Sequence, residues 1–223
     1  LNGALCERLT GFPDAKEKLE WLVKNNMFLL PLDEEGDWYR YHGLFAEFLR
    51  SQLKRDYGSD IPGLQLRAAE WFSENALWSE AVRHAIDAGG MALATQCLER
   101  CSMEELKASR VRGFLDWVRR VPSETLRGQP RLRVAFIWAL ILTMHLDEAQ
   151  AMIDDVEAQL RGAGSAESDE LIPILRVQRV AALSTRDETE AALALCKQVW
   201  AERYPDGRRP SQGFDWVDEV FLN

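Results

Sequence analysis

Cysteine is scarce in this sequence, and no long apolar run is present. The four cysteines form no Cys-x-x-Cys pair and no Cys/His cluster, which argues against a structural zinc site. The longest apolar run, residues 134–142, falls far short of the roughly 20 residues that a membrane-spanning helix needs. No signal-peptide pattern opens the chain. We therefore expect free thiols in a reducing cytoplasm, no metal site and no membrane contact.

Motifs for catalysis and for phosphate binding are also missing. Residues 162–165 read Gly-Ala-Gly-Ser, but they lack the lysine of a phosphate-binding loop. No Gly-x-Ser-x-Gly, His-Glu-x-x-His or Cys–His nucleophile pattern occurs. His84 and His145 stand alone at or near expected helix turns, where a structural role is the simplest interpretation. We expect no catalytic residue in this chain and no enzyme activity of its own.

The charge balance is acidic rather than basic. Against 27 Lys and Arg the chain carries 36 Asp and Glu, a net charge of −9. Nucleic-acid-binding modules normally present a basic face, so direct contact with DNA is not expected. The first residue is Leu rather than Met, and we expect the chain to be a central piece of a larger polypeptide.

The first part of the sequence alternates helix and strand patterns. A short helix is expected over 16–26, and an apolar run follows at 27–32. The acidic segment 33–37 contains a glycine and leads to the aromatic segment 38–41, so the two runs predict a β-hairpin. Helix patterning resumes at 44–53. Helix, hairpin and helix together are typical of a winged-helix unit.

A segment of residues that interrupt helices comes next, and pairs of predicted helices follow it. Residues 56–63 are rich in polar residues, glycine and proline, so we place a domain boundary there, with a winged-helix unit at 1–60 and helical repeats at 61–223. The repeat region shows helical stripes of apolar residues and no strand pattern. These stripes span residues 66–72, 77–86, 132–140, 146–160, 174–181 and 192–199.

A short phrase recurs at the turns between these helices. Each copy is a polar turn that ends in Glu-Ala, at Glu80, Glu148 and Glu190. The first two copies lie 68 residues apart, twice the 34-residue tetratricopeptide period, and the third lies 42 further on. An extra loop at 162–169 would account for the longer step. The prediction is an α-solenoid of antiparallel, tetratricopeptide-like helix pairs.

Tryptophan is frequent, with eight residues in the chain. Trp138 lies in an apolar run and is expected in the core, while Trp71 and Trp78 flank a turn between helices and are expected to pack between repeats. Aromatic side chains on a concave binding face are the alternative. The full set is Trp21, Trp38, Trp71, Trp78, Trp117, Trp138, Trp200 and Trp216.

Segments 19–29 and 38–49 carry a more specific signal than periodicity does. They resemble the winged helix of one family, the MalT-like ATP-binding transcriptional regulators of the LuxR family, which belong to the STAND class. Segments 67–72 and 80–85 resemble the start of their helical-repeat region. The resemblance covers most of the chain, is sharpest over 19–86 and fades after about 160.

This resemblance implies a regulatory arm between a nucleotide-binding region and a DNA-binding domain, both outside this chain. The winged helix would help to hold a resting ADP-bound state, and the repeats would receive a small inducer or a partner protein. ATP or ADP would bind the longer protein and not this piece of it. Self-association of the longer protein would follow activation. A pure protein–protein scaffold without a small-molecule ligand is the alternative function.

The resemblance also gives His42 a role. Residues 41–44, Tyr-His-Gly-Leu, are similar to the Met-His-Asp-Leu motif of STAND proteins, whose histidine contacts a phosphate of bound ADP. Gly43 departs from that motif at the acidic position. An imidazole N–H can donate to phosphate. The other interpretation is that His42 caps the following helix or packs beside Tyr41. The candidate wing at 33–37 is acidic, so phosphate would repel it and DNA contact is not expected.

Overall fold

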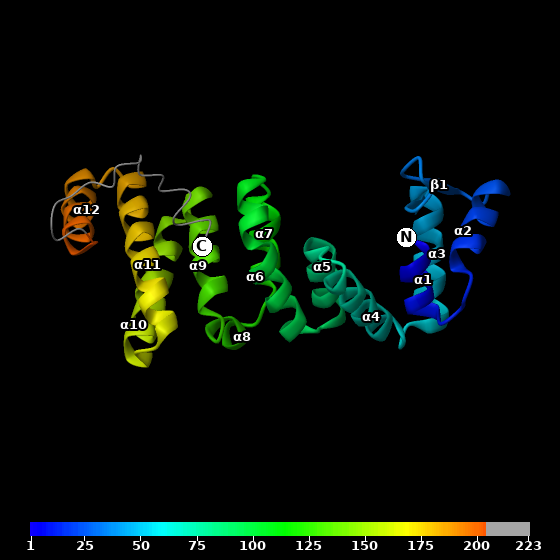
Figure 1. Cartoon of the computed structure of the whole chain (residues 1–223), viewed down its shortest axis with the longest axis horizontal. Helices are drawn as coiled ribbons and strands as arrows, with labels where there is room; N and C mark the ends of the chain where they lie inside the picture. The colour runs from blue at the N-terminus through cyan, green and yellow to red at the C-terminus, as the bar shows by residue number, and fades with distance from the viewer. Residues whose placement is uncertain (204–223) are drawn as a thin grey trace. The chain divides into compact units, whose positions relative to one another are not determined.

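The computed structural model describes residues 1–203, which are mainly helical and carry a two-stranded hairpin (Figure 1). The chain divides into two compact units, Leu1–Cys97 and Leu98–Asn223. Helix α6 (Met91–Lys107) contains the division. None of the helices over residues 1–203 is both long and apolar enough to cross a membrane.

The first unit contains the helix–hairpin–helix arrangement that the sequence predicts, followed by a helix pair. Its elements are α1 (Gly3–Thr10), α2 (Ala15–Lys24), β1 (Leu29–Pro31), β2 (Tyr39–Tyr41), α3 (Gly43–Tyr57), α4 (Ile61–Glu74) and α5 (Trp78–Ala88). The strands are antiparallel, and Leu30 lies opposite Arg40. Buried Leu19, Leu29 and Tyr39 join α2 to the hairpin.

The acidic turn of the hairpin is held by its own first residue. The Asp33 carboxylate accepts hydrogen bonds from the backbone N–H groups of Asp37, at 2.8 Å, and Trp38, at 3.0 Å. Lys16 of α2 pairs with Asp37 at 2.8 Å on the exposed side. These contacts show that the acidic residues form a solvated turn of the predicted hairpin.

Helix α1 is an addition to the predicted elements. It contributes one fully buried side chain, Leu5, so its apolar stripe is too thin to be recognised from periodicity. Its ends do carry signals in the sequence. The Asn2 side chain accepts a hydrogen bond from the Leu5 N–H at 2.8 Å, and Gly11 ends the helix at φ 72°.

The second unit, as far as it is described, is an array of helices. After α6 come α7 (Val111–Arg119), α8 (Ser123–Arg127), α9 (Pro130–Leu142), α10 (Leu146–Ala163), α11 (Ala166–Thr185) and α12 (Thr189–Arg203). Helix α9 contacts both α10 and α11, and α11 contacts α12. Contact between every second helix is typical of stacked helix pairs. The mainly α, helical-repeat fold predicted from the sequence is thereby confirmed.

Small residues after the turns let paired helices pack closely, as the Glu-Ala phrase predicts at two of its three copies. Ala81 in α5 and Ala149 in α10 are fully buried. At the third copy the prediction is wrong by one residue, because Ala191 is exposed and Ala192 is buried.

The extra loop predicted at 162–169 is also wrong. Helix α10 runs to Ala163 and α11 begins at Ala166, so the additional residues lengthen two helices. Ser165 causes this, because its hydroxyl accepts a hydrogen bond from the Ser168 N–H and forms a capping box with that residue. The three residues between α3 and α4 replace the longer predicted linker at 56–63. The domain boundary near residue 60 stays a prediction.

Candidate functional site

His42 lies where the hairpin passes into α3. Its backbone N–H donates to the Phe28 carbonyl at 2.7 Å, which extends the pairing of β1 and β2 by one step. Its carbonyl accepts a hydrogen bond from the Ala46 N–H at 2.9 Å and so begins α3. The backbone of His42 is therefore fixed from both sides, while its side chain is exposed.

The imidazole does not cap α3. His42 occupies the N-cap position, but its side chain makes no capping hydrogen bond. Tyr41 instead packs against Phe45, with ring centroids 5.6 Å apart. Gly43 leaves the approach to the helix end open, because a methyl group there would meet no atom within 4 Å. An exposed imidazole and the uncapped N-terminus of a helix are both able to donate N–H groups to an anion.

The segments that adjoin His42 carry exposed aromatic and aliphatic side chains. Phe28 is 59% exposed and packs on Phe45, with ring centroids 5.0 Å apart. Leu44 is 75% exposed and Phe48 is 53% exposed. Phe28 also has a positive φ of 55°, which is costly for a residue with a side chain. An apolar surface of this kind on a folded domain is typical of a region that another surface covers.

A second feature of the first unit is a groove of about 610 Å³ where α1, α3 and α4 meet. This volume falls within the range of small-molecule sites. The sequence predicts no site here, because its walls come from three separate segments. The lining residues are Leu9 and Thr10 at the end of α1, Phe12 after it, Leu53 and Tyr57 in α3, Ser59 and Asp60 before α4, and Gly63, Leu64 and Arg67 in α4.

His84 has structural surroundings, as the sequence predicts, whereas the side chain of His145 is exposed. The ring of His84 stacks on Phe72 at a centroid separation of 5.2 Å, and its Nδ1 is paired with Gln65. Burial lowers the pKa of His84, and nearby Arg83 lowers it further. His145 precedes α10 and its Nδ1 lies 2.9 Å from the Thr143 hydroxyl.

The cysteines of the described chain are free thiols, as the sequence predicts. Cys97 and Cys101 are buried on α6, and burial raises the pKa of Cys97 to about 11. A thiol with so high a pKa is a poor nucleophile at neutral pH. Within residues 1–203 no three His, Cys, Asp or Glu side chains gather as metal ligands would.

The burial of the tryptophan side chains differs in part from the prediction. Trp138, expected in the core, is half-buried, and so are Trp71 and Trp78. Trp71 makes an edge contact with Trp38 of the hairpin at 6.4 Å. Trp21 is exposed on α2. Trp216 lies outside the described residues.

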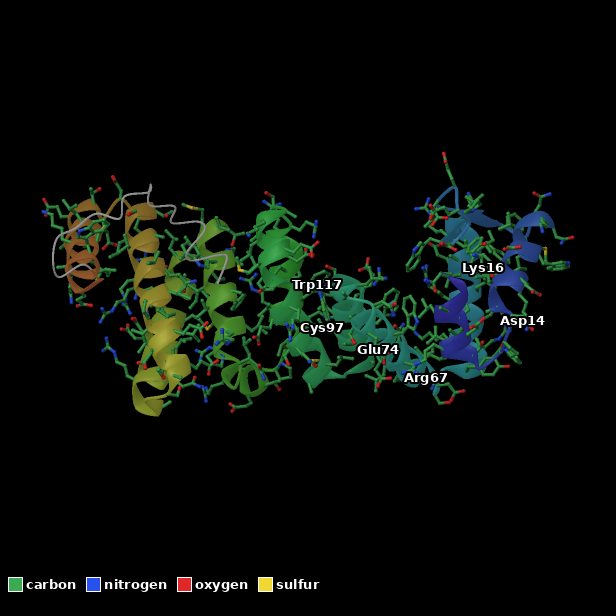
Figure 2. All side chains as sticks on the ribbon, viewed as in Figure 1. Asp14, Lys16, Arg67, Glu74, Cys97 and Trp117 are labelled. Carbon is green, nitrogen blue, oxygen red and sulfur yellow. The ribbon has the colours of Figure 1, made fainter. Side chains whose placement is uncertain are left out.

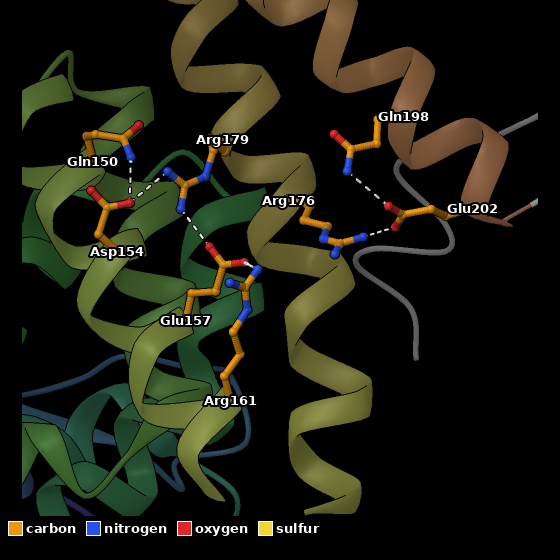
Figure 3. Close-up of polar contacts among 8 residues, drawn as sticks. All are labelled: Gln150, Asp154, Glu157, Arg161, Arg176, Arg179, Gln198 and Glu202. Carbon is orange, nitrogen blue, oxygen red and sulfur yellow. Dashed lines mark hydrogen bonds and ion pairs between the residues drawn. The ribbon is translucent and has the colours of Figure 1, made fainter. Parts of the chain in front are cut away.

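The second unit contains ion pairs between helices, in a network around Arg179 and in a separate group around Glu202 (Figure 3). Arg179 of α11 bridges two carboxylates of α10, Asp154 and Glu157, each at 2.7 Å. Arg176 pairs with Glu202 of α12, to which Gln198 also donates. The members of this network satisfy one another, which makes it a stabilising connection between helices rather than a ligand site.

Comparison with known proteins agrees with the geometry of the first unit. Residues 1–61 match the sequence model of the MalT winged helix domain. The chain is 29% identical over 233 residues to the serine/threonine-protein kinase PknK of Mycobacterium tuberculosis H37Rv, with 91% of this chain and 21% of that protein aligned. PknK of Mycobacterium bovis matches to the same extent. The chain thus spans about a fifth of the length of these relatives. Both likenesses support a regulator of the MalT type.

Proposed function

We propose that this chain is the sensor and assembly arm of a MalT-like, ATP-dependent transcriptional regulator of the LuxR family and STAND class. Its repeats would bind an inducer or a partner protein, and its winged helix would couple that event to the nucleotide state. The observation that carries the proposal is the order of parts: a MalT-type winged helix over residues 1–61 leads directly into helix pairs. Stacked helix pairs present extended binding surfaces.

His42 is the residue through which the winged helix would sense nucleotide. Its side chain is exposed, makes no capping hydrogen bond to α3 and lies next to Gly43, where no atom blocks the approach to the helix. An imidazole N–H is therefore free to donate to a phosphate oxygen. The chain itself lacks a phosphate-binding loop, so another part of the longer protein has to hold the ADP or ATP. The apolar side chains around His42 would be covered by that part in the resting state.

This chain would not act as an enzyme or touch nucleic acid in that scheme. Its acidic hairpin turn is unsuited to DNA, and a cytoplasmic location fits a regulator of transcription. The longer protein would bind DNA through another domain and would self-associate on activation. The PknK relatives are named as serine/threonine-protein kinases. The same kind of arm would therefore also fit a protein that signals through a kinase domain.

A scaffold that binds only proteins is the alternative function. A thermal-shift screen of metabolites against the 223-residue chain separates the two. Stabilisation by one small molecule supports the sensor, because ligand binding to the native state raises apparent stability. No stabilisation across the screen, together with capture of a defined protein partner, supports the scaffold.

A further inference from the structure

We infer that the groove between α1, α3 and α4 binds a small apolar zwitterion, an apolar amino acid or a short peptide with free ends. Its walls combine leucine and aromatic side chains with a few polar groups, the composition of a small-molecule site. Phe12 and Tyr57 are largely exposed beside it, so their rings offer apolar surface that the chain itself leaves uncovered.

Two opposite charges line this groove without pairing to each other. Asp60 precedes α4, and its carboxylate does not cap the helix. Pro62, two residues on, has no N–H to offer. Across residues 1–203, the one recorded side-chain partner of Asp60 is the Ser59 hydroxyl, at 3.3 Å. Arg67 donates to the Leu9 carbonyl at 3.3 Å and forms no ion pair with a described carboxylate.

The spacing of these charges suits an ammonium and a carboxylate on one ligand. Residues seven apart on a helix share a face, so Asp60 and Arg67 both look into the groove. The long side chain of Arg67 reaches back over Gly63, where an added methyl group would lie 3.8 Å from its Nη1. Arg67 and Asp60 line the same groove and form no ion pair with each other among the described residues. A ligand carboxylate fits Arg67, its ammonium fits Asp60, and its apolar part fits the leucines and rings.

The position of Arg67 beside α1 and α4 is visible in Figure 2. A ligand here would join three helices of the first unit. Helix α3 carries Tyr57 at the groove and begins directly after His42. Coupling between the groove and His42 rests on the proposed function, whereas binding in the groove does not.

Calorimetry and thermal shift on the 223-residue chain test the binding. The probes are L-leucine, L-phenylalanine and the dipeptide Leu-Phe, each compared with its N-acetyl and C-amide derivatives at low-millimolar concentration. We expect at least one free zwitterion to bind, and blocking either end to weaken it at least about tenfold. Binding by the amino acids or by the dipeptide alone supports the proposal and identifies the source.

Single substitutions test which charged side chains of the groove contact the ligand. Arg67→Gln and Asp60→Asn should each weaken binding about tenfold, while Arg50→Gln and Glu47→Gln, on exposed positions of α3, should leave it unchanged. Gly63→Leu should abolish binding by filling the groove while the chain stays folded. No binding of any free zwitterion, or equal binding of the blocked probes, overturns the proposal. Either result leaves the role proposed for His42 untouched.

Discussion

His84 is a titratable group that the fold holds in its neutral form. Its ring stacks on Phe72 across the α4–α5 pair, and burial lowers its pKa from the ordinary value of 6.5. The unfolded chain therefore binds a proton at a higher pH than the folded chain does. Stability from this residue is fully present above 6.5 and is lost as the pH falls from there toward the folded pKa.

Replacing His84 with phenylalanine should keep the stack on Phe72 and remove the titration. We expect the midpoint of thermal unfolding of His84→Phe to change less than that of the native chain as the pH falls below about 6.5. Thermal unfolding at a series of pH values measures this difference, with His145→Gln as the exposed control. Equal pH dependence in the native chain and His84→Phe would show that the buried imidazole does not contribute.

Gln178 is a fully buried polar side chain in the second unit. Its Nε2 donates to the Val134 carbonyl at 2.7 Å, but within the described chain its Oε1 has no hydrogen-bond partner. A buried acceptor without a partner carries a desolvation cost. The position is therefore poorly adapted for stability.

Gln178→Met should remain within about 1 kcal/mol of the native free energy of unfolding, or exceed it, because it removes the unpaired oxygen and keeps the volume. Gln178→Glu should lose about 2 kcal/mol or more at neutral pH, because it buries a charge without a counterion. Urea unfolding of both variants tests the pair. A strongly destabilised methionine variant would mean that the bond to Val134 dominates.

At the scale of elements, backbone conformation decides the role of individual glycines. Gly113 lies in helix α7 with open space around it, whereas Gly89 ends α5 at φ 76° with equally open space. The same added methyl group therefore meets no atom within 4 Å at either position. Only the backbone conformation distinguishes them.

Gly113→Ala should stabilise the chain by about 0.5–1 kcal/mol, since alanine favours the helix. Gly89→Ala should destabilise it by about 1 kcal/mol, since a Cβ is unfavourable in the left-handed region. Chemical denaturation of the two variants in parallel measures both signs. The same sign for both would refute the conformational explanation.

Helix pairing in the second unit depends in part on ion pairs. Arg179 is mostly buried and joins two carboxylates of α10, while Arg127 and Glu124 form an exposed pair within α8. Shielded pairs between elements contribute more than exposed pairs within one helix. Arg133, 4% exposed, similarly connects α9 to Asp155 and to Gln159 of α10.

Arg179→Met should therefore cost about 1–2 kcal/mol of unfolding free energy, and Arg127→Met at most about 0.5 kcal/mol. Raising the salt concentration to about 1 M should reduce the cost at Arg179 only in part, because its partner Glu157 is shielded from solvent while its partner Asp154 is exposed. Unfolding curves at low and high salt compare the two variants. Equal costs would show that burial of the network contributes nothing.

The elements that the sequence predicts are those with a strong repeat of apolar residues. Helix α10 follows from such a repeat, and α9 follows from an almost unbroken apolar run. Helix α1 is short and polar. Helix α7 does carry an apolar stripe, with Phe114, Leu115 and Val118 buried, but it is absent from the predicted elements. Exposure of His42 could not be predicted, because capping depends on the geometry at the end of β2. The groove was beyond prediction, since it joins residues 9–12, 53–57 and 59–67 through tertiary packing.

For the whole molecule, the chain is one section of a longer regulator in this account. It covers 21% of the PknK relatives, and its winged helix supplies an exposed histidine and an apolar surface but no phosphate-binding loop. Under the proposed function, coupling to nucleotide would therefore have to involve a second domain. If only the resting state makes a contact with the nucleotide, removal of that contact shifts the equilibrium toward the active state.

The rate of ADP release from the longer protein tests this claim most directly. The account predicts faster ADP release and higher basal output for His42→Ala, because the resting state loses a phosphate contact, with His145→Ala as an exposed control that leaves both unchanged. Unchanged ADP retention and unchanged basal output in His42→Ala would contradict it.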